Sequence, residues 1–458
     1  MRPKKILKEL INPSNGKRIF QYLLATIVLI GLTFRAIMAN DGNVDKYLIL
    51  AAILGFYLAM AMGANDVANN MGPAVGAKAL NLVGAVLIAA VFEAAGALIA
   101  WWDVTQTIKW GIISPTAIND PQIFLHIMIA TLLGGAIWVN VATFMRIPVS
   151  ATHSTIWALL GAGLMAVPRL DIINWGKIGE IVMSWIVSPL MWGILAAIFS
   201  YIIVITIFRQ KDRYTATQKW LPVFVGVMAG VFTVYLMLKG LKKVVSIDLG
   251  ESLWMWTLVW LITYMGLRIY LQKHNGLFKN SKKSIKKMFN IPLVFAVSLL
   301  SFAHWSNDVA NAIGPVAAIN DLVKNGKIVI GSTHIPTWIM MLGGLGLAVW
   351  LMIWGAKIIK TVGKKITKID QPRAFSIALA TAITVILASH LGLPISTTHV
   401  AIWGVFGVGF LREFQKRRRG KTKDYIEKEI VRNIVLAWVV TLPIAGFLAA
   451  LTYFILSL

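Results

Sequence analysis

Two pairs of short polar motifs stand out because they combine carboxylates, carboxamides, hydroxyls and imidazoles. Residues 65–73, NDVANNMGP, recur 242 positions later as residues 307–315, NDVANAIGP. Residues 148–153, PVSATH, recur as residues 394–399, PISTTH, at an offset of 246. Two motif pairs at nearly one offset indicate an internal duplication of the chain.

The first motif offers oxygen ligands for a cation. Asn65 and Asn69 are four residues apart and share one helix face, and Asp66 lies three residues before Asn69. Gly72-Pro73 then predicts the end of the helix, because proline cannot donate the helical hydrogen bond. Amide and carboxylate oxygens suit a hard cation such as Na⁺. A capping network that only holds two helices together is the alternative. The expected cation ligands are Asn65, Asn69, Asn307 and Asn311.

The second motif has the order of a helix N-terminus, a proline followed by hydroxyl residues. Such an end presents unpaired backbone N–H groups and about half a positive charge, which together bind oxyanions. One end from each half can grip a tetrahedral anion from two sides, with ordinary helix capping as the alternative. The expected anion-binding residues are Asp66, Ser150, Thr152, Asp308, Ser396, Thr397 and Thr398.

Four further ionisable residues accompany the motifs. Glu93 lies inside the apolar stretch 79–102, where an unpaired carboxylate is expensive, so it is a candidate cation ligand or proton carrier. The alternative for Glu93 is a protonated acid packed between helices. His153 and His399 end the second motif in both halves, where they either support the structure or relay a proton. His304 precedes only the second copy of the first motif, so it can gate or orient one side.

The elements that carry these motifs are membrane-spanning helices. The 458 residues are 58% hydrophobic and 14% charged, with no cysteine and a net charge of +25. Apolar windows of the length that a bilayer requires predict about 11 to 13 spans. With the N-terminus inside, 33 of the 44 Lys and Arg residues fall in cytoplasmic segments, which explains the positive charge without a nucleic-acid partner. The predicted fold is therefore an all-α polytopic membrane protein.

The predicted topology makes the two halves antiparallel. The apolar run 47–63 enters the first motif from outside, whereas 291–306 enters the second copy from inside, and both runs are short enough to predict helices broken within the membrane. Inverted repeats with broken or re-entrant helices are the architecture of secondary transporters. We expect four segments, namely a basic N-terminus with a signal-anchor helix at 1–46, transport repeat 1 at 47–208, a connector with two probable spans at 209–290 and transport repeat 2 at 291–458.

The charge balance favours coupled transport. Two aspartates beside a phosphate or sulfate repel it unless cations or protons accompany the anion. A carboxylate accepts a hydrogen bond from the P–OH of phosphate but only repels fully ionised sulfate, so phosphate is favoured. An enzyme is not expected, since cysteine and the H-E-x-x-H and G-x-S-x-G motifs are absent and the polar residues repeat symmetrically.

GANDVANNMGPAVGAK, AHWSNDVANAIGP, IPVSATHS and LPISTTHV together resemble the paired signatures of the inorganic phosphate transporter (PiT) family. The resemblance covers roughly 47–170 and 291–411 and implies phosphate carried with Na⁺ or H⁺ between the Ser/Thr helix ends and the motif aspartates. Glu93 and His304 also match the family pattern. Three departures are tryptophans in place of glycine, at Trp157, Trp305 and Trp403, which imply a narrower pathway or a bar to close helix approach. The fourth departure is Ala378, where an acid is expected.

We therefore expect a symporter of inorganic phosphate coupled to Na⁺ or H⁺, with no other cofactor. A sulfate symporter of the same fold and a passive anion channel are the alternatives. The expected location is the plasma membrane, in contact with the lipid bilayer, with the N-terminus cytoplasmic and the C-terminus outside. The sequence leaves open whether the protein forms a homodimer, how many ions accompany each phosphate, and what the three tryptophans do.

Overall fold

The computed structural model describes residues 13–99, 102–118, 120–145, 147, 149–241, 248–274, 278–328, 334–351, 353, 369–418, 420, 426 and 428–458. Helices make up nearly all of this part of the chain, and the β pairing within it is one isolated bridge between Ile113 and Ile173. The prediction of an all-α membrane fold is confirmed. Nine helices in the described ranges are long and apolar enough to cross a bilayer.

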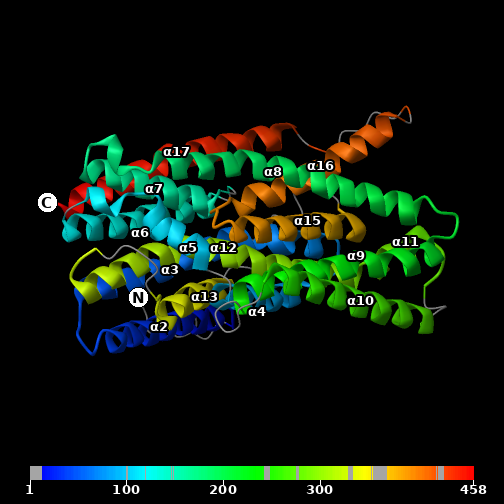
Figure 1. Cartoon of the computed structure of the whole chain (residues 1–458), viewed down its shortest axis with the longest axis horizontal. Coiled ribbons are helices and arrows are strands. Elements are labelled where there is room, and N and C mark those ends of the chain that lie inside the picture. The colour runs from blue at the N-terminus through cyan, green and yellow to red at the C-terminus, as the bar shows by residue number, and fades with distance from the viewer. Residues whose placement is uncertain are drawn as a thin grey trace, which may run out of the picture.

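The helices pack side by side along the long axis of the molecule (Figure 1). The α-helices are α2 Pro13–Ala39, α3 Lys46–Gly76, α4 Leu82–Ile99, α5 Trp102–Gln106, α6 Pro121–Phe144, α7 Ala151–Ala166, α8 Trp175–Ile203, α9 Arg213–Tyr235, α10 Leu249–Lys273, α11 Lys282–Met288, α12 Asn290–Asn325, α13 Thr337–Trp350, α15 Gln371–His390, α16 Thr397–Arg417 and α17 Lys428–Leu456. The π-helical segments are η1 Thr107–Gly111, η4 Val204–Phe208 and η5 Leu236–Leu241, and the 3₁₀ turns are η2 Pro115–Ala117 and η3 Leu170–Ile172.

Aspartates cap the N-termini of three helices of the central bundle, α3, α6 and α15. Asp45 caps α3 by accepting the backbone N–H groups of Tyr47 and Leu48. Asp120 caps α6, with Pro121 in the first turn, where its missing N–H costs no hydrogen bond. Asp370 caps α15 in the same way. These caps satisfy N–H groups that would otherwise have no partner at the ends of apolar helices.

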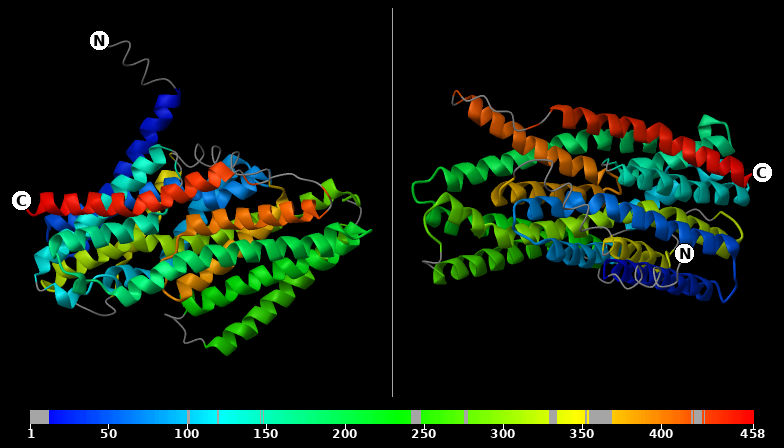
Figure 2. Two further views of the ribbon diagram at one scale, coloured as in Figure 1. Left: turned by 90° about the horizontal axis from the view of Figure 1, so that it is seen from above. Right: turned by 180° about the vertical axis from the view of Figure 1, so that it is seen from behind.

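Helices α3 and α12 form the antiparallel centre of the bundle. Gly55 in α3 packs against Ala312 and Val316 in α12, whereas Asp66, further along α3, lies beside His304, earlier in α12. The opposite sense of the two runs confirms the inverted repeat. Most of α12 is buried, and helices α9 and α10, from the segment predicted to be a connector, lie along one flank of the bundle (Figure 2).

The breaks expected in α3 and α12 do not occur. Both helices run without interruption through the polar motif, and they include Pro73 and Pro315 as interior residues. The prediction that Gly72-Pro73 ends the helix was therefore wrong. A proline removes one helical hydrogen bond, and in a packed membrane bundle the neighbouring helices compensate for that loss. Beside Pro315, Gly314 has no side chain, and a Cβ there would lie 2.9 Å from Ile108 of η1.

The re-entrant form of the prediction is confirmed in two hairpins. Helices α6 and α7 begin and end at one end of the molecule, because Ser114 before α6 donates its backbone N–H to Ile172 after α7. Helices α15 and α16 enter from the other side, so that the two hairpin tips meet near the middle (Figure 1). A re-entrant hairpin at membrane depth is tolerated where its backbone is buried in protein.

Each hairpin packs against a helix of the other half through one close glycine-to-glycine contact. A Cβ at Gly161 of α7 would collide with the carbonyl of Gly446 in α17, and one at Gly407 of α16 would collide with the carbonyl of Gly193 in α8. Gly161 and Gly407 are 246 positions apart, the same offset as the second motif. The backbones touch at both crossings, as in small-residue helix packing in membranes.

Of the two effects expected of the tryptophans, a bar to close helix approach is wrong for Trp157 and Trp403. The carbonyl of Trp157 lies 3.3 Å from the Cβ position of Gly446, and that of Trp403 lies 3.1 Å from the Cβ position of Gly193. Both tryptophans therefore sit at the close crossings, with their main chain in the contact. Trp305 is fully buried in the central helix α12, and Ala378 of α15 is buried in the apolar core.

Candidate functional site

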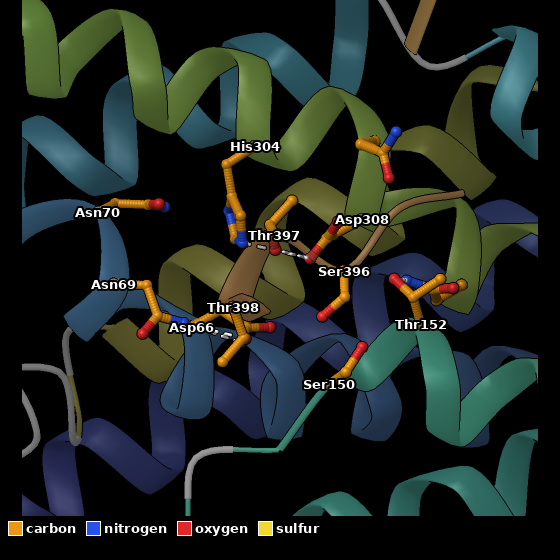
Figure 3. A network of polar contacts seen from close by, with 12 residues as sticks. Asp66, Asn69, Asn70, Ser150, Thr152, His304, Asp308, Ser396, Thr397 and Thr398 are labelled. Atoms are coloured by element: carbon orange, nitrogen blue, oxygen red, sulfur yellow. Dashed lines mark hydrogen bonds and ion pairs between the residues drawn. The ribbon is translucent and has the colours of Figure 1, made fainter. Parts of the chain in front are cut away.

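The N-termini of α7 and α16 meet between the two halves of the molecule (Figure 3). Ser150 caps α7 by accepting the backbone N–H of His153 at 3.1 Å, and Ser396 caps α16 by accepting that of His399 at 3.3 Å. Capping uses a lone pair of each hydroxyl and does not use its hydrogen. Thr152 Oγ1 donates to the carbonyl of Ile395 at 3.0 Å, which joins the two tips directly.

Each central helix reaches across to the hairpin of the opposite half. Asn69 of α3 donates its amide to Thr398 Oγ1 at 3.0 Å, and Asn311 of α12 donates to Thr152 Oγ1 at 3.1 Å. The two contacts are equivalent under the duplication, because each joins the same motif positions with the halves exchanged. The site is therefore built jointly by both repeats.

Two aspartates and one histidine form the charged centre of the site. One ligand atom each from Asp66, His304 and Asp308 lies within 4.8 Å of the others, and all three side chains are buried. Thr398 Oγ1 donates to Asp66 Oδ1 at 2.9 Å, and Thr397 Oγ1 donates to Asp308 Oδ2 at 2.7 Å. His304 Nε2 lies 3.2 Å from the same oxygen of Asp308.

Glu93 of α4 borders this centre. Its Oε1 accepts the amide of Asn70 at 2.8 Å and lies 4.0 Å from His304 Nδ1. His304 thus stands between the carboxylates of Glu93 and Asp308, one beside each ring nitrogen. This arrangement can hold a proton or a cation between two acids.

Several buried oxygens at the site have no hydrogen-bond partner among the described residues. They belong to acids and amides from both central helices, which would be costly to bury unless they bind something. Such oxygens fit a hard cation and also the P–OH of a protonated anion. The atoms are Asp66 Oδ2, Asp308 Oδ1, Asn307 Oδ1 and Asn311 Oδ1.

The other predicted residues are placed differently. The side chain of Asn65 lies outside the described residues. Asn307 donates its amide to Ser389 Oγ at 3.1 Å and to the carbonyl of Leu393 at 3.0 Å, behind the hairpin tip. Both amide hydrogens are thereby used within the protein.

His153 and His399 form a pair at the meeting point of the tips. Their ring centroids are 4.4 Å apart in an edge-to-face arrangement. Each ring also packs on a tryptophan, His153 on Trp185 at 3.8 Å and His399 on Trp438 at 3.5 Å. This aromatic packing holds the tips in register, and proton relay by the pair stays a prediction.

Sequence reasoning missed two groups of residues. Asn70, the partner of Glu93, directly follows Asn69, but it has no equivalent in the second motif copy, where Ala312 stands. Lys109 and Asp321 form a buried ion pair between η1 and the last part of α12. A lysine among apolar residues was the available signal.

These features define the class of protein. A sequence model described as "Phosphate transporter family" matches residues 62–449, which is most of the chain. The chain belongs to the phosphate transporter family.

Individual relatives agree with this assignment. The chain is 45% identical over 402 residues to a Helicobacter pylori (strain J99) protein described as "Putative phosphate permease", which covers 86% of this chain and 75% of that protein. It is 38% identical over 423 residues to a Pyrococcus abyssi protein described in the same words, with coverage of 90% and 99%. A solved structure described as "The sodium-dependent phosphate transporter" superposes with a TM-score of 0.82 at 34% identity, over 90% of this chain and 99% of that chain.

Proposed function

We propose that the protein is a secondary active symporter that carries inorganic phosphate together with Na⁺, by alternating access at the site between the two repeats. The observation that carries the proposal is the pair of reciprocal bonds, from Asn69 to Thr398 and from Asn311 to Thr152. A site shared equally by two inverted halves opens to either side when one half rocks against the other.

The anion chemistry favours phosphate. Two helix N-termini and the hydroxyls of Ser150 and Ser396 supply donors without an arginine. Asp66 and Asp308 supply acceptors for a P–OH group, which sulfate lacks at neutral pH. Donors and acceptors in one buried site select a partly protonated oxyanion, because an unmatched group in a dry site costs about 1–3 kcal/mol.

The cation coupling follows from charge. Two buried carboxylates next to a phosphate are unfavourable unless a cation neutralises them. The oxygens of Asn307, Asn311 and the acids that have no partner within the described ranges are suited to Na⁺. The description of the superposed structure as sodium-dependent supports Na⁺ as the coupling ion. Proton coupling through His304, between Glu93 and Asp308, is the second candidate.

Uptake of radiolabelled phosphate into proteoliposomes tests the proposal. An inward Na⁺ gradient at equal pH should drive accumulation above the external concentration, and a pH gradient without Na⁺ should drive little. Accumulation with the pH gradient alone would show that the coupling ion is H⁺ and not Na⁺. Equilibration without accumulation would favour the passive anion channel, and stronger competition by unlabelled sulfate than by phosphate would favour the sulfate symporter.

We also propose a plasma-membrane orientation with the N-terminus cytoplasmic. The α8–α9 connection, with Arg209 and Lys211, and helix α11, with four lysines, lie at the end opposite the C-terminus (Figure 1). The chain has no cysteine, so single substitutions report sidedness without background. Lys211→Cys should react with an impermeant maleimide only from the cytoplasm, and Asp171→Cys only from outside. The opposite labelling pattern would show that the N-terminus lies outside.

A further inference from the structure

A short helical segment of the first repeat packs against both elements that form the site. Helix α5 is followed directly by the π-helical turn η1, and together they form the α5–η1 segment, residues 102–111. It lies beside α12 (Figure 1) and carries none of the site residues described above. Single π-helical turns are rare and occur frequently at functional sites.

The segment contacts the tip of the α15–α16 hairpin at Gly392. Thr107 Oγ1 donates to the carbonyl of Gly392 at 2.7 Å. Gly392 has a φ of +66°, and a Cβ there would lie 3.4 Å from the carbonyl oxygen of Asp103. The next residue, Leu393, gives its carbonyl to the amide of Asn307. The segment therefore touches the turn that holds a motif residue of α12.

The same segment packs along α12, starting beside the site. Ala310, which precedes the site residue Asn311, forms a buried apolar cluster with Val104 and Ile108. Further along α12, the Cβ position of Gly314 lies 3.2 Å from the Cβ of Ile108. The segment thus covers α12 closely from the motif outward.

A buried ion pair fastens the far end of this contact. Lys109 of η1 pairs with Asp321 of α12, and the exposed fractions of the two side chains are 0% and 6%. Removing two charges from water is expensive, and an apolar pair of similar volume often packs at least as well. The charges are useful if this contact also has to open, because water then hydrates both of them.

The duplication does not supply this ion pair twice. The offset of 242 positions places Ala79 at the position equivalent to Asp321, and Ala79 lies beyond the end of α3 at Gly76. The first repeat therefore has no acid at the matching position. Because the repeats are inverted, the ion pair belongs to one side of the site.

We propose that the α5–η1 segment is a gate on the side of the site where α12 ends, and that the Lys109–Asp321 ion pair holds this gate closed. In the proposed orientation this is the outer side. The closed segment covers Ala310 and contacts the hairpin tip. Opening separates Ile108 from Gly314 and lets water reach the ion pair. The inference rests on the proposed alternating access.

A reversible cross-link tests whether the segment must move. Ile108→Cys with Gly314→Cys joins Cβ positions that are 3.2 Å apart, in a chain without other cysteines. Disulfides need about 3.5–4.5 Å, so a small adjustment is sufficient. Oxidation should lower phosphate uptake into proteoliposomes at least about tenfold, because a gate that cannot open blocks entry, and dithiothreitol should restore it.

A cross-link within one hairpin is the matched control. Gly135→Cys with Thr155→Cys joins α6 to α7, where the Cβ position of Gly135 lies 3.8 Å from Thr155 Cα. Oxidation of this variant should leave its uptake within about twofold of the reduced form, since the gate stays free. Loss of maleimide-reactive thiols confirms that each cross-link has formed.

Thiol labelling tests whether the ion pair holds the gate closed. In Ala310→Cys the thiol lies beneath the segment, so an impermeant maleimide added from outside reaches it only when the gate opens. Adding Lys109→Gln and Asp321→Asn should speed this labelling about tenfold and lower the KM for external phosphate about threefold, because the open state becomes more populated. Ala296→Cys, buried in the other half of α12, is the matched control and should stay unreactive.

The outcomes distinguish the gate from the proposed function. Wild-type protein that equilibrates phosphate without accumulating it would overturn the symport, whereas the oxidised Ile108→Cys/Gly314→Cys variant must still block that flux. Accumulating protein whose uptake survives this cross-link would overturn the gate alone. A lower melting temperature with unchanged labelling and KM in Lys109→Gln/Asp321→Asn would show that the ion pair is only a structural brace.

A second variant covers the case in which Lys109→Gln/Asp321→Asn does not fold. Lys109→Met with Asp321→Leu replaces the charges by apolar groups that can pack against each other. Labelling of Ala310→Cys should then slow about threefold, because opening exposes apolar surface to water. Unchanged labelling in this background would overturn the role of the ion pair.

Discussion

The two halves of the site share a scaffold but differ in the surroundings of their acids. The amide-to-hydroxyl contacts across the repeats measure 3.0 Å and 3.1 Å. The acids are not equivalent, because Asp66 accepts from Thr398 of the opposite repeat, whereas Asp308 accepts from Thr397 of its own. Asp308 alone lies within hydrogen-bonding distance of His304 Nε2, at 3.2 Å.

Two substitutions account for this difference. The position equivalent to Thr397 is Ala151 in the first repeat, and the position equivalent to His304 is Met62. Both extra polar groups lie at Oδ2 of Asp308, and each acid keeps its other oxygen without a partner among the described residues. Duplication thus supplied a symmetric frame, and a few residues made one acid more strongly held than the other.

The largest expected effect separates the two acids. Asp66→Asn and Asp308→Asn should each reduce phosphate uptake by about 100-fold or more, because breaking a buried charged contact costs about 3–5 kcal/mol. Adding His304→Gln should partly restore only Asp308→Asn, since that variant alone leaves His304 without its 3.2 Å partner. Initial uptake rates in proteoliposomes measure both effects. Unaltered uptake in Asp66→Asn would remove that acid from the mechanism, and equal restoration of both variants would make the acids equivalent.

The glycine crossings of the two hairpins should contribute equally to stability, although the surroundings of the two acids differ. Gly161→Ala and Gly407→Ala should each lower the free energy of unfolding by about 1–3 kcal/mol, because both place a methyl group against a neighbouring helix backbone. Thermal unfolding in detergent compares them. Gly179→Ala is the control, since nothing lies within 4 Å of its Cβ position, and it should be neutral or stabilising. A large difference between Gly161→Ala and Gly407→Ala would show that the repeats do not pack alike.

Removing the extra hydroxyl should make the second half resemble the first. Thr397→Val keeps the shape of the side chain and deletes the 2.7 Å bond to Asp308, so the KM for phosphate should rise about tenfold. Thr131→Val is the matched control, because the Thr131 hydroxyl is buried and donates to the carbonyl of Ile127 in its own helix. Uptake measured over a range of phosphate concentrations gives both KM values. An unchanged KM in Thr397→Val would show that the bond from Thr397 to Asp308 does not contribute to phosphate binding.

The sequence was sufficient for the fold class because the motifs repeat. The common offset predicted the duplication, and the alternating topology of the apolar spans predicted that the halves are inverted. A proline followed by Ser150 or Ser396 predicted the helix starts at the hairpin tips. It was misleading for α3 and α12, where local rules for Pro73 and Pro315 predicted breaks. Tertiary packing overrode those rules, and packing cannot be read from neighbouring residues along the chain.

The partners of the site residues were the least predictable part. Ser389 and Tyr235 are isolated polar residues in apolar helices, and no spacing connects them to the motifs. Asn70 stands in the first motif, but it has no counterpart in the second copy that would mark it. Their roles depend on which helices lie side by side. Asn307 shows the same limit, because its motif position predicted a ligand but not the network that orients it.

The smallest expected effect concerns the two helix caps. Ser150→Ala and Ser396→Ala should each lower the free energy of unfolding by about 1 kcal/mol through loss of the cap. If the same hydroxyls also donate to the anion, the KM for phosphate should rise about fivefold in both variants. Unequal KM shifts would show that the anion sits closer to one repeat.

Ser281→Ala separates capping from anion binding. Ser281 caps α11 by accepting the N–H of Ser284 at 3.3 Å, in a helix that carries none of the site residues. Its loss should give a comparable or smaller stability change with an unchanged KM, because the orphaned N–H group is the same and no anion donor is removed. If Ser150→Ala and Ser396→Ala behave like this control, the tip hydroxyls act only as caps. The anion would then be bound by the backbone N–H groups and the threonines, whose contribution the Thr397→Val comparison measures.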